Sequence, residues 1–239
     1  MRRLIAIMLT VALVLSMAVP AMATEGASTS VYVGVITLFA ATGNGSSSGA
    51  PGLGHAFLSF KNITSTDKLV GVYSVAPGEE ITFGTWGNTS SFGNVGVWYN
   101  LESYLMGAKR SFANRVSLSV AVTQSDLNAI NAIINNPEPY HLTDYNCVNF
   151  ALDIYYETPY MYVLSIGNPA YPVHLMNSIQ TTGEYETGKS VDFSNDVGYA
   201  ENGEFKSVTD DVLADIYDEL RYNDAEIMEV NPDHDNHID

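Results

Sequence analysis

Apolar runs of strand type fill the first half of the chain, and helical spacing replaces them in the second half. Short runs rich in Val, Ile, Phe and Tyr that are bounded by Gly, Pro and Asn are typical of β-strands. Their close spacing predicts an antiparallel sheet. Strands are expected at Val31–Phe39, His55–Phe60, Leu69–Val75, Ile81–Trp86, Val97–Asn100 and Arg115–Val122, with another at Tyr162–Ile166.

Helical periodicity is clearest around the single cysteine of the chain. Apolar residues spaced at i, i+3, i+4, i+7 and i+8 form one helical face. Other helices are expected at Leu101–Lys109, Thr123–Asn136 and Pro172–Ile179, the second beginning with a capping-box pattern. The chain therefore predicts an α+β fold, an antiparallel sheet packed against helices. The face that carries the cysteine comprises Cys147, Phe150, Ala151, Ile154 and Tyr155.

Residues 1–23 are typical of a secretory signal peptide. Arg2 and Arg3 precede an apolar stretch of about 16 residues, and Ala21-Met22-Ala23 matches an A-x-A cleavage site. The apolar stretch is short for a membrane span, which needs about 20 residues. We therefore expect a secreted or cell-surface protein, of bacterial type because an exported chain with one cysteine forms no internal disulfide. No integral membrane segment is expected after signal cleavage.

Charge divides the remainder of the chain at about residue 180. The formal net charge is −17, and residues 180–239 hold 17 acidic and 3 basic side chains. A domain over residues 24–180 is expected, followed by an acidic C-terminal extension over 181–239 with one helix near 208–222. Nucleic acid is excluded as a partner, because the phosphate backbone binds basic surfaces.

Cys147 lies where a polar turn gives way to a helix, with Asn146 as a suitable N-cap. The positive end of the helix dipole favours a thiolate at this position. A cysteine nucleophile also needs a histidine base within hydrogen-bond reach. His55, which begins a strand directly after glycine, is the preferred base over His141 and His174. The alternative is that Cys147 is a small core residue and that His55 is structural.

The segments GHAFLSFKN and PYHLTDYNCVNFAL together resemble the circularly permuted papain-like cysteine peptidases. That group includes permuted NlpC-type peptidases, PPPDE peptidases and lecithin retinol acyltransferase-like enzymes. A histidine on an early strand precedes a cysteine at a helix start in these proteins. The resemblance covers roughly residues 31–156. Its pattern is matched by Tyr140, Leu142, Asn146, Cys147 and Phe150.

The resemblance implies a Cys147–His55 dyad, with an oxyanion bound by backbone N–H groups at the helix start and by Asn146. A third polar group usually follows the histidine in this family, and this chain offers no second histidine there. Thr85 and Asn88 are the candidates for that position, ahead of Tyr73 and Glu80.

The function expected is hydrolysis of an amide bond in a peptide, with bacterial cell-wall peptide among the candidate substrates. The same dyad supports acyl transfer or thioester hydrolysis. A non-catalytic secreted binding domain is the alternative from another class. No cofactor and no metal are expected, since the acidic tail lacks the Gly and the terminal Glu of a calcium loop. Trp86, Trp98 and Tyr99 would line a substrate groove or, as the preferred interpretation, fill the core.

Overall fold

The computed structural model describes residues 31–42, 54–86, 96–109 and 111–216. The predicted signal peptide and Asn88 lie outside these ranges. Within them, no helix is both long and apolar enough to cross a membrane.

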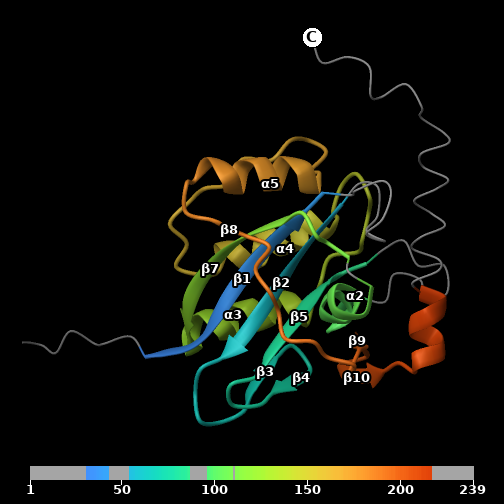
Figure 1. The fold of residues 1–239 in the computed structure, drawn as a ribbon. Helices are drawn as coiled ribbons and strands as arrows, with labels where there is room; N and C mark the ends of the chain where they lie inside the picture. The colour runs from blue at the N-terminus through green and yellow to red at the C-terminus, as the bar shows by residue number, and fades with distance from the viewer. Residues whose placement is uncertain (1–30, 43–53, 87–95, 110, 217–239) are drawn as a thin grey trace, which may run out of the picture. The chain divides into compact units, whose positions relative to one another are not determined.

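An eight-stranded antiparallel sheet forms the centre of the fold, in the order β10-β9-β6-β5-β2-β1-β7-β8 (Figure 1). The predicted α+β class and antiparallel sheet are confirmed. The central strand β1 pairs with β2 on one side and with β7 on the other, and its burial on both faces explains its continuous apolar sequence. The strands are β1 (Tyr32–Ala41), β2 (His55–Asn62), β5 (Glu80–Thr85), β6 (Val97–Tyr99), β7 (Arg115–Thr123), β8 (Glu186–Thr187), β9 (Gly198–Glu201) and β10 (Glu204–Ser207).

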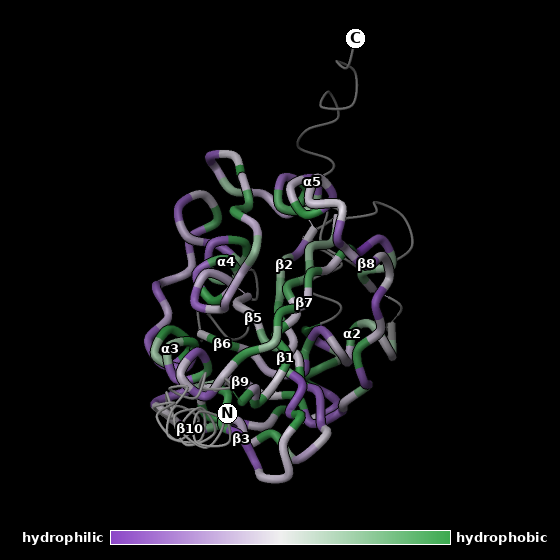
Figure 2. Tube along the Cα trace, turned by 90° about the vertical axis from the view of Figure 1, so that its left-hand side faces the viewer, coloured by the Kyte–Doolittle hydropathy of each residue, from purple (hydrophilic) through white to green (hydrophobic). Residues whose placement is uncertain are grey.

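Helices cover both faces of this sheet. One apolar core joins the sheet to α3 (Gln124–Ile134), α4 (Cys147–Tyr156) and α5 (Pro172–Thr181). A second core on the opposite face joins it to α2 (Leu101–Lys109). Figure 2 shows α3 and α4 on one side of the central strands and α2 on the other. Successive side chains of β2 therefore point into different cores, Leu58 into the first and Phe57 into the second.

Local capping fixes where α3 and α4 begin. Thr123 and Asp126 form the predicted capping box at α3, and Asn146 and Asn149 form another at α4. These contacts satisfy backbone N–H groups that a helix start otherwise leaves without partners. The position of Cys147 as the first residue of α4 follows from the second box.

Two expected strands are wrong. Leu69–Val75 is a hairpin, in which β3 (Lys68–Val70) and β4 (Tyr73–Val75) pair across a turn at Gly71 with φ of +58°. Glycine adopts such angles at little cost, so the chain reverses there. Tyr162–Ile166 is irregular and pairs with none of the described strands, although Leu164 within it joins the first core.

The acidic segment after residue 180 contributes to the sheet at both of its edges. Strand β8 pairs with β7, and the β9–β10 hairpin pairs with β6. Residues 210–216 are helical, as expected for part of 208–222, and they bury Leu213 and Ile216 in the second core beside Val197. Up to residue 216 this segment is therefore built into the compact unit that begins at Tyr32, and is not appended to it.

Because Leu213 is buried against the sheet, Leu213→Ala should lower the free energy of unfolding by about 2–5 kcal/mol in urea titrations. Val163→Ala is the control, since Val163 is 82% exposed, and it should change that free energy by no more than about 0.5 kcal/mol. Equal, small effects of the two changes would show that the segment after residue 207 does not pack on the sheet.

Candidate active site

His55 begins β2 at the end of the sheet where β1 finishes. It pairs in register with Ala41, the last residue of β1. Gly54, with φ of +79°, brings the chain into the strand, and a side chain there would collide with the carbonyl oxygen of Ala41. A glycine is thus required directly before His55 for the histidine to occupy this place.

A buried carboxylate, that of Glu102, holds the imidazole ring. Oε1 of Glu102 lies 3.1 Å from Nε2 of His55 and accepts a hydrogen bond of 2.7 Å from the indole N–H of Trp86. Glu102 is in the first turn of α2, next to the positive end of the helix dipole. His55 from β2 and Trp86, the residue after β5, therefore converge on one oxygen atom.

The backbone of β5 leaves room for this contact at Gly84. A Cβ atom built at Gly84 would lie 2.8 Å from Oε1 of Glu102 and 3.6 Å from Nε2 of His55. The first distance is shorter than real Cβ contacts allow. Any side chain at Gly84 would thus displace the carboxylate from the ring.

Cys147 approaches His55 from another part of the chain, at the first residue of α4. Helix α4 packs against β2 and β5, and Cys147 at its start lies close enough to His55 to raise the pKa of the imidazole. Because Nε2 is bonded to Glu102, Nδ1 is the ring nitrogen left for another partner. The sequence-predicted pair Cys147 and His55 is therefore brought together.

The surroundings of His55 favour its charged form. The ring is 3% exposed and lies 3.9 Å from the Trp86 ring, centre to centre. Burial alone lowers the pKa of His55, but hydrogen bonds and charge from Cys147 and Glu102 outweigh it and raise the pKa to about 9. A cation over the indole face is also favourable.

Because its pKa is higher in the folded protein than in the unfolded chain, protonated His55 contributes to the free energy of unfolding in a way that depends on pH. The unfolded value is about 6.5. The stabilisation by the charged ring therefore has its full size below about pH 6.5, and it is lost as the pH rises through about 9.

Asn146 was expected to bind the oxyanion, but its side chain caps α4 instead. Its side-chain oxygen accepts from the N–H of Val148, and its amide donates to the carbonyls of Leu142 and Ala170 at 2.9 and 2.8 Å. Both amide protons are thus in use, and neither is left for an oxyanion. Asn146 instead fixes the start of α4 and ties it to the segment before α5.

The predicted third polar groups lie elsewhere. Thr85 is buried, and its hydroxyl has no hydrogen-bond partner among the described residues. Tyr73 donates to Asp196, and Glu80 accepts from Ser59. Asn88 lies outside the described residues. The place expected for them, beside the histidine, belongs to Glu102, which sequence reasoning missed.

The other histidines considered as the base, and the tyrosine of the family pattern, lie in different surroundings. His141 is exposed and lies 3.6 Å from Asp144, and His174 lies on α5 against Tyr171. Tyr140 lies close to Cys147. Burial and the electrostatic influence of Cys147 both raise the Tyr140 pKa, so its hydroxyl stays protonated.

The aromatic residues considered for a groove, Trp86, Trp98 and Tyr99, are all buried. In the described ranges no group of three or more His, Cys, Asp or Glu side chains is placed to hold a metal ion. Comparisons with protein-family models, with curated proteins and with solved structures gave no match. The chemistry of this site is therefore inferred from its geometry.

Titration of the His55 ring by NMR should give a midpoint near pH 9. Glu102→Gln keeps an acceptor for Nε2 but removes the charge, so the midpoint should fall below about 9, while Cys147 continues to raise it. Glu80→Gln is the matched control, because Glu80 bonds Ser59 of β2 and not His55. An unchanged midpoint in Glu102→Gln would show that the carboxylate does not stabilise the charged ring.

Proposed function

We propose that this protein is a secreted thiol hydrolase that cleaves amide bonds, with Cys147 as nucleophile, His55 as general acid and base, and Glu102 as the residue that positions His55. The observation that carries the proposal is the hydrogen bond between His55 and the buried Glu102, together with the raised pKa that Cys147 and Glu102 give His55 from two other elements. A structural histidine needs one buried partner. This one has a carboxylate on Nε2 and a thiol close enough to raise the pKa of the ring, which is what an activated nucleophile needs.

The reaction would proceed in two steps. The Cys147 sulfur attacks the carbonyl carbon, and the C–N bond of the tetrahedral intermediate breaks as His55 gives its proton to the leaving amine. A water molecule then loses a proton to His55 and attacks the thioester. Breakage of the C–S bond releases a carboxylic acid and restores the Cys147–His55 pair.

The start of α4 offers a donor for the developing oxyanion. Asn146 caps the N–H of Val148, and the N–H of Phe150 bonds the Asn146 carbonyl. For the Cys147 N–H the described residues provide no hydrogen-bond acceptor. This N–H and the helix dipole would stabilise negative charge on the carbonyl oxygen of the substrate.

A permuted papain-like relationship is supported by the order of the parts. His55 lies on β2, the second strand of the chain, and Cys147 follows later at a helix start. Export rests on the predicted signal peptide. An exported bacterial hydrolase of this kind meets peptides outside the cell, and cell-wall peptide is one candidate among them.

Cys147 should react with iodoacetamide at neutral pH faster in the folded protein than in urea, because the charged imidazole favours the thiolate. His55→Gln should slow this alkylation, since glutamine keeps a donor for Glu102 but carries no charge. His55→Ala is a poorer test, because it leaves the buried Glu102 without its charged partner at a cost of about 3–5 kcal/mol. Alkylation no faster than in urea would contradict the proposal.

Turnover is tested by incubating the mature protein with cell-wall peptides and with a mixed peptide digest, and detecting new amino termini by mass spectrometry. Cys147→Ala should produce none, with a melting temperature close to that of the parent protein. Cleavage that persists in Cys147→Ala would exclude the thiol mechanism.

A further inference from the structure

Phe112 has an unusual backbone conformation for a bulky residue. Its φ is +57°, in the left-handed region that residues other than glycine and asparagine rarely occupy. The other non-glycine residues with positive φ in the described ranges, Asn100 and Asn202, are both asparagines. Phe112 is also only 1% exposed. A strained, buried residue keeps such a conformation only where its surroundings hold it, and such residues cluster at functional sites.

The Phe112 ring borders the imidazole of His55. The two ring centres are 5.7 Å apart. Two more aromatic rings lie beside the imidazole, those of Phe57 at 5.8 Å and Trp86 at 3.9 Å. Phe112 contacts both of them, at 5.5 and 6.4 Å. The rings of Phe57, Trp86 and Phe112 all belong to the second core and form an aromatic cage beside His55.

Arg115 fastens the backbone of Phe112. Nη1 of Arg115 donates to the Phe112 carbonyl at 3.0 Å. Nε and Nη2 donate to the carbonyls of Lys189 and Gly188, just after β8, at 2.6 and 2.9 Å. A planar guanidinium fixes several acceptors relative to one another, which a single ammonium group does less well. The acidic segment after residue 180 is thereby tied to the turn that carries Phe112.

The sheet places Arg115 and His55 at the same end. Ala41, the last residue of β1, pairs with His55 on one side and with Arg115 on the other. The three residues thus form one row across β2, β1 and β7. The turn that carries Phe112 directly precedes β7, so it lies at the end of the sheet where His55 lies.

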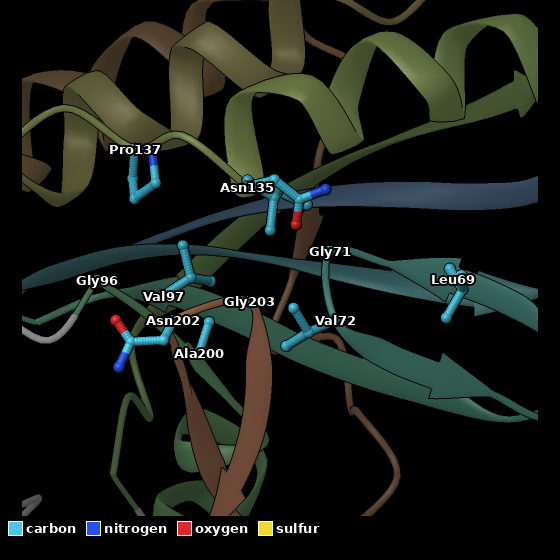
Figure 3. A pocket seen from close by; sticks show the side chains of 11 residues that line it. Leu69, Gly71, Val72, Gly96, Val97, Asn135, Pro137, Ala200, Asn202 and Gly203 are labelled. Atoms are coloured by element: carbon cyan, nitrogen blue, oxygen red, sulfur yellow. The ribbon is translucent and has the colours of Figure 1, made fainter.

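The pocket shown in Figure 3 is not part of this arrangement. It lies between the end of α3 and the β9–β10 hairpin, and its lining contains none of the cage residues. Val97 and Ile134 of that lining belong to the first core, whereas the aromatic cage belongs to the second. The contacts of Phe112 with His55 are thus separate from this pocket.

The aromatic cage acts on the charged form of the imidazole. Glu102 from α2 and Cys147 from α4 raise the pKa of His55, and burial opposes them. An aromatic ring excludes water as an aliphatic side chain does, but its face also attracts a cation within about 6 Å. Phe112 therefore helps to bury the imidazole without disfavouring its charge. Arg115, bonded to the Phe112 carbonyl, is a like charge that acts in the opposite direction.

We propose that Phe112 is a positioning residue of the hydrolase: its ring holds the His55 imidazole in its charged form beside Glu102, and Arg115 keeps the ring in place. The role in the reaction rests on the proposed function, in which His55 gives its proton to the leaving amine. The charge of His55 itself is measurable in the resting protein. Through Arg115, the acidic segment after residue 180 contributes to the site.

The test compares Phe112→Leu with Phe39→Leu in the full mature chain. Leucine is apolar but has no aromatic face, so the NMR titration midpoint of His55 should fall by about 0.5–1.5 pH units in Phe112→Leu. Phe39 is the matched control, because it is fully buried in the same core and stacks on Phe57 at 4.7 Å. Phe39→Leu should leave the midpoint unchanged. An unchanged midpoint in Phe112→Leu, or an equal fall in Phe39→Leu, would overturn the proposal.

Arg115→Lys tests the same contact without altering any ring of the cage. Lysine keeps the positive charge but holds the three carbonyls less firmly, so the His55 midpoint should again fall, by at least about 0.3 pH units. This variant decides the question if Phe112→Leu does not fold. An unchanged midpoint in Arg115→Lys would then overturn the proposal.

Turnover separates this proposal from the proposed function. In Phe112→Leu the alkaline limb of the pH–rate profile for peptide cleavage should move down with the His55 midpoint. KM should stay unchanged, because the ring acts through His55. A limb that stays in place although the midpoint has moved would overturn the role of Phe112 in the reaction. Alkylation of Cys147 is measured in the parent protein without either variant, so the two proposals fail separately.

Discussion

The contact between Glu102 and His55 is the constraint on which the site depends. A buried carboxylate is costly unless a charged partner compensates it. Glu102 is fully buried, its Oε1 meets both His55 and Trp86, and its Oε2 has no hydrogen-bond partner in the part of the chain that the structure describes. The protonated imidazole is therefore what makes this carboxylate tolerable in the interior. The same carboxylate, with Cys147, raises the pKa of that imidazole.

The residues that raise the pKa of His55 come from both faces of the sheet. Glu102 is presented by α2 on one face, and Cys147 by α4 on the other. They reach the same ring because His55 is the first residue of β2, where the sheet ends and no longer separates them. Antiparallel pairing of β2, β5 and β6 fixes this end, and Gly84 leaves space for the carboxylate. The three groups are all buried at this end of the sheet.

The sequence predicted the parts of the structure that local patterns encode. Strand β1, helix α2 and the capped starts of α3 and α4 follow from periodicity and capping, and the pairing of Cys147 with His55 followed from a family resemblance. Glu102 was missed because an acidic residue in the first turn of a helix is common. Nothing in the local sequence shows that this side chain is buried or that it contacts a histidine 47 residues earlier in the chain. The strands β8 to β10 were missed because a short, acidic segment lacks strand periodicity, and only the free edges of the sheet make it pair. The hairpin at Gly71 depends on one backbone angle that the alternation of LVGVYSV does not reveal.

The most direct test of the central claim is chemical cross-linking of the thiol to its histidine with 1,3-dibromoacetone. Cys147 attacks first, and the short three-carbon bridge then reaches only a nucleophile in contact with the sulfur. Peptide mapping by mass spectrometry should find Cys147 joined to His55, with no bridge in the denatured protein. A reagent arm that is merely hydrolysed, or that joins Cys147 to the exposed His141, would contradict the arrangement of Cys147, His55 and Glu102 described here.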